Sequence, residues 1–163
     1  MQGKKERIVL GVDPGTGKLG WAVLHQASAV KLLDCGCVET KANTPLADRL
    51  ELIASELEKV IKKYAPCELA IEEIFFMKNV KTGISVAHAR GVAMLVAKKA
   101  GLIISEYKPN AIKLAIAGYG HATKEQMIKM VSLHLRGCKI TQDDTVDAIA
   151  VALCHLEKND CFF

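Results

Sequence analysis

The sequence predicts an α/β domain with a mixed five-stranded sheet and helices on both of its faces. Three short, β-branched apolar segments come first, and two more then alternate with segments of helical periodicity. The chain has 163 residues, half of them hydrophobic and a quarter charged, which is ordinary for one globular domain. Because neither a repeat nor a linker divides the sequence, we expect a single domain over residues 1–163.

The first three strands are expected at residues 7–12, 19–25 and 30–39. The first of them is followed by Asp13-Pro14-Gly15, which is a turn signal. The links between these strands are short, so the three segments predict an antiparallel meander.

A helix is expected next, because Thr44 can cap a helix and Pro45 suits the first helical position. Apolar residues then recur at helical spacing as far as Ile61. The fourth and fifth strands are predicted at residues 68–75 and 102–107, and a helix over residues 80–100 lies between them.

The last third of the chain is predicted to be helical. One helix starts at Pro109 and is interrupted at residues 118–120, and two more cover residues 124–135 and 143–157. Crossovers between parallel strands are expected to be right-handed. The whole pattern suits an RNase H-like fold, although composition alone does not separate this from other mixed α/β folds.

The composition narrows the function classes. The net charge of +4, from 22 basic and 18 acidic residues, permits a nucleic-acid partner without requiring one. The apolar stretches are far shorter than the ~20 residues of a membrane span, and the N-terminus does not read as a signal peptide. We therefore expect a cytoplasmic protein with no membrane partner, in which the six cysteines are reduced thiols.

Two strands carry carboxylates where charge is unusual. Asp13 follows the first strand, where it can face a ligand or simply cap the turn. Glu72 and Glu73 lie within an apolar strand, and alternation points them to opposite faces. A buried charge is costly unless it is paired or metal-bound, so we expect one of the two glutamates to be functional. The residues alone do not say which one.

The last helix carries Asp144 and Asp147, which are three apart and share a face. Helix capping explains Asp144, because residues 141–144 fit a capping box. Asp147 lies further into a largely apolar helix, where a carboxylate needs a cation. The strand and helix carboxylates together form an oxygen-rich set of the kind that Mg²⁺ prefers. Two ions about 4 Å apart could clamp both oxygens of a phosphodiester displacement.

Five sequence blocks have a recognisable pattern. The first is the opening segment with Asp13-Pro14-Gly15-Thr16, and similar Asp-x-Gly-Thr turns also open actin-like ATPases. The others are residues 69–79, 89–92, 117–126 and 144–150. Together these blocks resemble the RuvC family of bacterial Holliday-junction resolvases, and they occur in the family's order and near its spacing over nearly the whole chain.

This resemblance implies a metal-dependent crossover junction endodeoxyribonuclease, a hydrolase that makes paired symmetric nicks in four-way DNA junctions during recombination and repair. It also implies a homodimer, the RuvA and RuvB branch-migration proteins as partners, and two Mg²⁺ ions per site with Mn²⁺ as a substitute. It selects Glu72 over Glu73, although some members carry histidine in place of Asp144. The implied metal-binding catalytic residues are Asp13, Glu72, Asp144 and Asp147, and the implied catalytic lysines are Lys113 and Lys124.

DNA contacts are expected from basic and aromatic residues around these carboxylates. The resemblance implies that Phe75 acts at the junction, although Phe75 and Phe76 could also be core residues. Lysine and arginine side chains can contact phosphates and make binding strongly dependent on salt. The candidates are Phe75, Lys78, Lys81, Arg90, Lys113 and Lys124.

Three other functions compete with this one. A YqgF-type nuclease shares the opening motif and acts on RNA, but should lack the lysine-bearing glycine turn at residues 117–126. An actin-like ATPase needs a second lobe, for which 163 residues are too few. A non-catalytic junction-binding protein would not need all four acidic positions.

Overall fold

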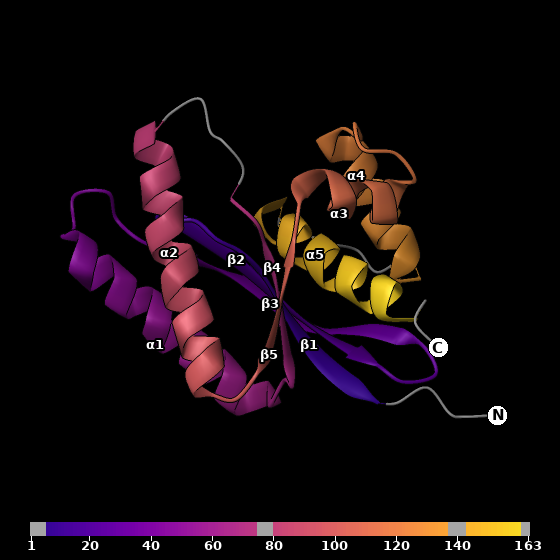
Figure 1. Ribbon diagram of the computed structural model, residues 1–163, viewed down its shortest axis with the longest axis horizontal. Helices are drawn as coiled ribbons and strands as arrows, with labels where there is room; N and C mark the ends of the chain where they lie inside the picture. The colour runs from indigo at the N-terminus through magenta and orange to yellow at the C-terminus, as the bar shows by residue number, and fades with distance from the viewer. Residues whose placement is uncertain (1–5, 75–79, 137–142, 161–163) are drawn as a thin grey trace.

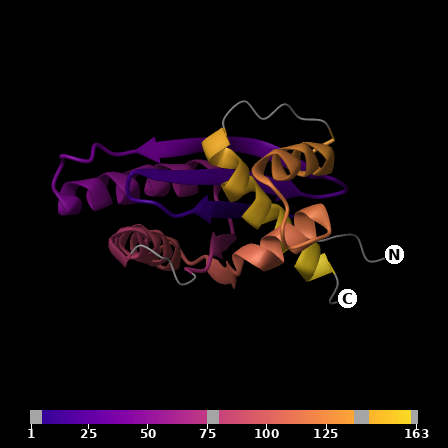
Figure 2. The same cartoon turned by 90° about the horizontal axis from the view of Figure 1, so that it is seen from above.

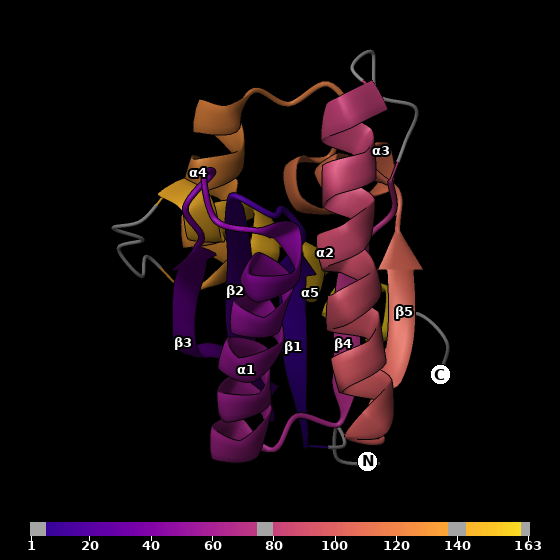
Figure 3. The same ribbon diagram turned by 90° about the vertical axis from the view of Figure 1, so that its left-hand side faces the viewer.

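A computed structural model describes residues 6–74, 80–136 and 143–160. Its central sheet is covered by helices on both faces (Figures 1 and 3). The strands are β1 (Arg7–Asp13), β2 (Lys18–Gln26), β3 (Val30–Glu39), β4 (Glu68–Glu72) and β5 (Ile103–Tyr107). The helices are α1 (Leu46–Tyr64), α2 (Val80–Lys99), α3 (Pro109–Ala117), α4 (Lys124–His134) and α5 (Asp143–Asp160).

The sheet is mixed, with the strand order β3-β2-β1-β4-β5. Strand β2 is antiparallel to both β1 and β3, whereas β1, β4 and β5 run parallel to one another. The predicted mixed five-stranded sheet is therefore confirmed. Because the carboxyl ends of parallel strands meet at one edge of a sheet, β1, β4 and β5 all deliver their last residues to the same edge.

Alternating residues of β1 divide the core into two parts. Val9 packs on the face that α3, α4 and α5 cover, and Leu10 and Val12 pack on the face that α1 and α2 cover. This alternation is the period of two that a strand buried on both faces requires. Helix α5 crosses the sheet, and α3 and α4 lie beside it (Figure 2).

The helices that carry the candidate lysines have clear ends. Helix α3 begins at Pro109 and ends at Ala117, and the next residue is Gly118, whose φ of 83° is left-handed and suits glycine. Helix α4 begins after Thr123, which forms a capping box with Gln126. These signals fix where α3 and α4 begin relative to the end of β5.

Strand β4 ends earlier than the sequence predicts, and β5 begins one residue later than expected. Strand β4 ends at Glu72, so the expected extension through residues 73 and 74 is wrong, and Phe75 lies outside the described residues. The Glu73 N–H closes the ladder by donating to the carbonyl of Tyr107 at 2.8 Å. Strand β5 ends there because Pro109, which has no N–H to donate, begins α3 two residues later. Within the described parts of the chain, no helix is long and apolar enough to cross a bilayer.

Candidate active site

Two of the candidate carboxylates lie at the ends of adjacent parallel strands. Asp13 is the last residue of β1, and Glu72 is the last residue of β4. The preceding residues, Val12 and Ile71, are partners in the parallel ladder. Adjacent parallel strands lie about 4.8 Å apart, so these two side chains emerge at neighbouring positions of the same edge.

Helix α5 brings the third carboxylate close to them. A Cβ atom at Gly11 would overlap the carbonyl oxygen of Ala148 and lie only 2.8 Å from the Cβ of Ala152. Glycine is therefore required for α5 to pack this closely against β1. Asp147 immediately precedes Ala148 and is exposed to solvent, and like Asp13 it is close enough to act on the charge of Glu72.

The charges at this edge act on Glu72. Burial, followed by the negative charges of Asp13 and Asp147, raises the pKa of Glu72 from 4.5 to about 7, while Lys113 opposes the rise. Burial disfavours the charged carboxylate, and two like charges add to that effect. The three carboxylates and Lys113 thus form one electrostatic cluster.

The turn after β1 is linked by hydrogen bonds to α1 and α2, which cover one face of the sheet. The hydroxyl of buried Thr16 hydrogen-bonds to that of Ser85 on α2. The Thr40 hydroxyl donates to the carbonyl of Thr16, and Arg49 Nε on α1 donates to the Thr40 hydroxyl at 2.8 Å. These bonds restrain the segment that directly follows Asp13.

The basic candidates lie on three helices. Lys113 is half-buried on α3 and acts on Glu72, which connects it to the carboxylate cluster. Lys124 is exposed at the first residue of α4, and Lys81 is exposed near the start of α2.

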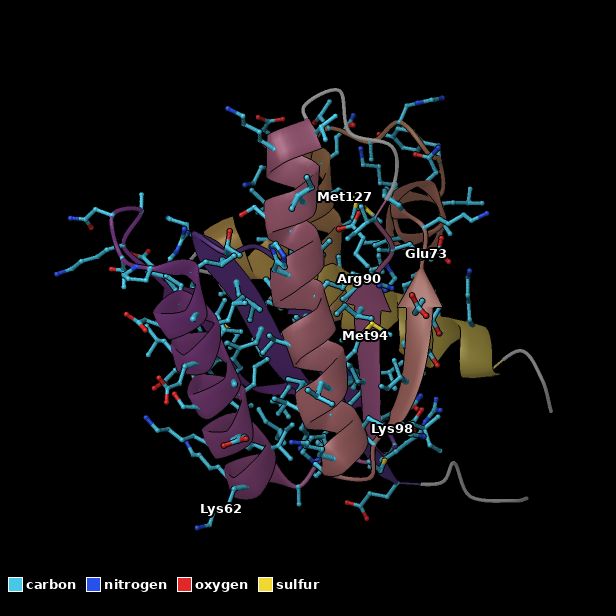
Figure 4. The ribbon with its side chains drawn as sticks, turned by 60° about the vertical axis from the view of Figure 1, so that its left-hand side comes forward. Lys62, Glu73, Arg90, Met94, Lys98 and Met127 are labelled. Atoms are coloured by element: carbon cyan, nitrogen blue, oxygen red, sulfur yellow. The ribbon has the colours of Figure 1, made fainter. Side chains whose placement is uncertain are left out.

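Arg90 also belongs to α2, and its side chain lies between this helix and the ends of β4 and β5 (Figure 4). Its side chain is only 17% exposed and pairs with the carboxylate of Glu106. Its Nε atom donates to the main-chain carbonyl of Glu72 at 3.1 Å. The sequence predicts a DNA contact here, but the structure joins this guanidinium to the end of β4.

Three site candidates lie outside what the structure describes. These are Phe75, Lys78 and the side chain of Asp144. Among the described side chains, no group of three or more histidines, cysteines, aspartates or glutamates is close enough to hold a metal ion. The donor chemistry of Asp13, Glu72 and Asp147 nevertheless fits a divalent cation, because a cation would offset both the burial and the like-charge repulsion that raise the pKa of Glu72.

Sequence reasoning missed a buried polar network on α5. His155 is 1% exposed, its Nδ1 hydrogen-bonds the Tyr107 hydroxyl at 2.7 Å, and its Nε2 pairs with the Glu68 carboxylate. Arg7 also pairs with Glu68, at 3.7 Å. One signal was available, because a histidine within an apolar helical run must find partners if it is buried.

The mixed sheet, with carboxylates where its parallel strands end, is the arrangement of the RNase H-like class of proteins. The family model "Crossover junction endodeoxyribonuclease RuvC" matches residues 9–155. A protein of that name from Roseiflexus sp. is 48% identical over 148 residues, covering 90% of this chain and 88% of its own length. Another from Brachyspira hyodysenteriae is 46% identical over 156 residues, covering 95% of this chain and 97% of its own.

A solved structure, described as Thermus thermophilus RuvC in complex with Holliday junction substrate, superposes with a TM-score of 0.88 at 32% identity. The match covers 95% of this chain and 96% of that one. The chain therefore belongs to the RuvC family of crossover junction endodeoxyribonucleases. Membership of this family makes it a hydrolase and implies a metal-dependent nuclease.

Proposed function

We propose that this chain resolves four-way Holliday junctions by paired symmetric nicks, hydrolysing phosphodiester bonds in homologous recombination and DNA repair. The observation that carries this proposal is the family match over residues 9–155. The charge cluster of Asp13, Glu72 and Asp147 supplies a site suited to that chemistry.

We propose that Asp13, Glu72, Asp144 and Asp147 hold divalent metal, with two Mg²⁺ ions per site and Mn²⁺ as a substitute. Bound there, the metal would supply an activated water and stabilise the charge that develops on the phosphate. The chain's own contribution is to hold carboxylate oxygens at the ends of β1 and β4 and on α5. Lys113 adds a positive charge beside Glu72, where it can steady the scissile phosphate.

DNA binding is assigned to the basic residues around this edge and to one aromatic side chain. Lys81, Lys113 and Lys124 stand on helices α2, α3 and α4, and each can neutralise a phosphate. Lys78 is proposed for the same role. Phe75 is proposed to stack on bases at the opened crossover.

Helix α2 also supports a homodimer. Val80, Ile84 and Leu95 are exposed by 70%, 54% and 55%, although α2 already packs other apolar residues against the sheet. A second apolar stripe is what a helix between a core and a partner chain presents. Two-fold symmetry would then direct two active sites to opposite strands of the junction. RuvA and RuvB are the proposed further partners, and the cytoplasm is the proposed location.

The proposal is tested by neutralising one carboxylate at a time and measuring cutting and binding separately. Asp147→Asn should abolish cleavage of a synthetic junction in Mg²⁺ and leave junction binding intact, because a lost ligand also reduces the repulsion of DNA. Glu73→Gln is the matched control, and its effect should be much milder. An Asp147→Asn protein that cuts at the wild-type rate would refute the metal site.

A further inference from the structure

Arg90 connects the ends of two parallel strands through one side chain. Its Nε atom donates to the carbonyl of Glu72, the last residue of β4, at 3.1 Å. A second guanidinium nitrogen pairs with the carboxylate of Glu106, the penultimate residue of β5. Only 17% of the side chain is exposed, and two of the guanidinium nitrogens contact the protein.

The two strand ends that Arg90 connects both lead to the carboxylate cluster. Glu72 pairs with Tyr107 in the ladder, and the Glu73 N–H donates to the Tyr107 carbonyl. Helix α3, which carries Lys113, begins two residues after Tyr107. A shift where β4 and β5 end would therefore move Glu72 and Lys113 relative to each other.

We propose that Arg90 is a positioning residue that fixes the end of β4, and with it the Glu72 carboxylate, by bridging the Glu72 carbonyl and Glu106. This inference rests on the proposed metal-dependent cleavage, and it names a residue that holds one of the proposed metal ligands in place. It also replaces the DNA contact that the sequence predicts at this position.

The chemistry of arginine makes the bridge specific. The guanidinium is a rigid planar fork whose N–H groups point in fixed directions, so it can satisfy two acceptors at once. A lysine at residue 90 would keep the charge but offer a single compact ammonium group, which does not reproduce that geometry. A displacement of catalytic groups by about 1 Å can slow a reaction by roughly a hundredfold.

The test compares Arg90→Lys and Arg90→Gln with the wild type in single-turnover cutting of a Mg²⁺-supplied synthetic junction, with protein at saturation. A positioning role predicts that both variants cut at least roughly tenfold more slowly. The salt dependence of junction binding should stay unchanged, because the bridge neutralises no phosphate. Lys98→Ala is the matched control, since Lys98 is exposed in the last turn of the same helix, and it should cut like the wild type (Figure 4).

A second measurement needs no cleavage. Mg²⁺ alone should raise the Tm of the DNA-free wild type, because a ligand that binds only the folded state stabilises it. The rise should be smaller in Arg90→Lys, where Glu72 is no longer fixed. A rise equal to that of the wild type would overturn the positioning role.

A phosphate contact gives the opposite pattern. In that case Arg90→Lys would cut at the wild-type rate, and Arg90→Gln would lower the salt slope by about one. If neither Arg90 variant melts cooperatively, Glu106→Gln takes their place, because that carboxylate is 42% exposed and its loss removes one anchor of the bridge. Slower cutting by Glu106→Gln at unchanged affinity supports the inference, and wild-type cutting overturns it. A wild type that neither cuts junctions nor responds to Mg²⁺ would instead refute the proposed function.

Discussion

Glu72→Gln should stabilise the metal-free protein while abolishing its activity. The pKa of Glu72 rises from 4.5 to about 7, chiefly through burial and then through Asp13 and Asp147. At about 1.4 kcal/mol per pKa unit, ionising this carboxylate in the folded state costs about 3 kcal/mol. Glutamine avoids that cost at a similar side-chain volume.

The pH dependence follows from the sign of this shift. A carboxylate whose pKa is higher in the folded than in the unfolded state destabilises the protein above pH 7 and has no such effect below pH 4.5. The free energy of unfolding should be measured by urea denaturation in EDTA at several pH values. At pH 8, Glu72→Gln should gain up to about 3 kcal/mol over the wild type, and this gain should shrink steadily toward pH 4.5.

Two controls make this test specific. Subtracting the wild type at each pH removes the contributions of all other titrating groups, provided that the substitution leaves them unchanged. Glu73→Gln makes the same change of side chain one residue later, beyond the end of β4, and is the matched control for the substitution itself. A Glu72→Gln protein that is less stable than the wild type at pH 8 would refute the electrostatic account of this site.

Three further predictions concern the lysines, the dimer and the buried network. At saturating protein, Lys113→Ala or Lys124→Ala should slow single-turnover cutting by roughly tenfold or more, whereas Lys98→Ala should change it little. Equal cutting rates in the three variants would mean that all three lysines only attract DNA. Leu95→Glu should shift the solution mass from dimer to monomer in analytical ultracentrifugation at micromolar protein, and an unchanged dimer would exclude this face of α2 from the interface. His155→Leu should lower the free energy of unfolding by at least about 2 kcal/mol, because it removes the partner of Tyr107 and Glu68. Burial lowers the pKa of His155, so the wild type should lose stability as the pH falls below 6.5, and the variant should lack this component in a urea titration.

Local sequence signals were sufficient for most of the fold. Helix α3 starts at Pro109 and α4 starts after the Thr123 cap, where backbone chemistry sets the boundary. The end of β4 was not predictable in the same way. The apolar run continues past Glu72, whereas the strand stops because its neighbour β5 ends before Pro109. Only tertiary pairing contains that information.

The candidate site was likewise only partly predictable from local sequence. The cost of burying a charge predicted that one of Glu72 and Glu73 is functional. The residues alone could not decide between them, because that choice requires knowing which one faces Asp13. The resemblance supplied that choice, and the structure places Glu72 under the influence of Asp13 and Asp147. Arg90 also depends on tertiary information. Its positive charge predicts a phosphate contact, which stays a prediction, whereas only the position of α2 relative to β4 and β5 reveals its contacts with the Glu72 carbonyl and Glu106.

The central claim is tested most directly by incubating the purified protein with one synthetic four-way junction, in Mg²⁺ and in EDTA. A linear duplex of the same sequence and a structured RNA serve as control substrates. The account predicts two symmetric nicks on opposing strands of the junction in Mg²⁺, none in EDTA, and little cutting of either control. Cutting of the RNA in preference to the junction, or junction cutting that persists in EDTA, would contradict it.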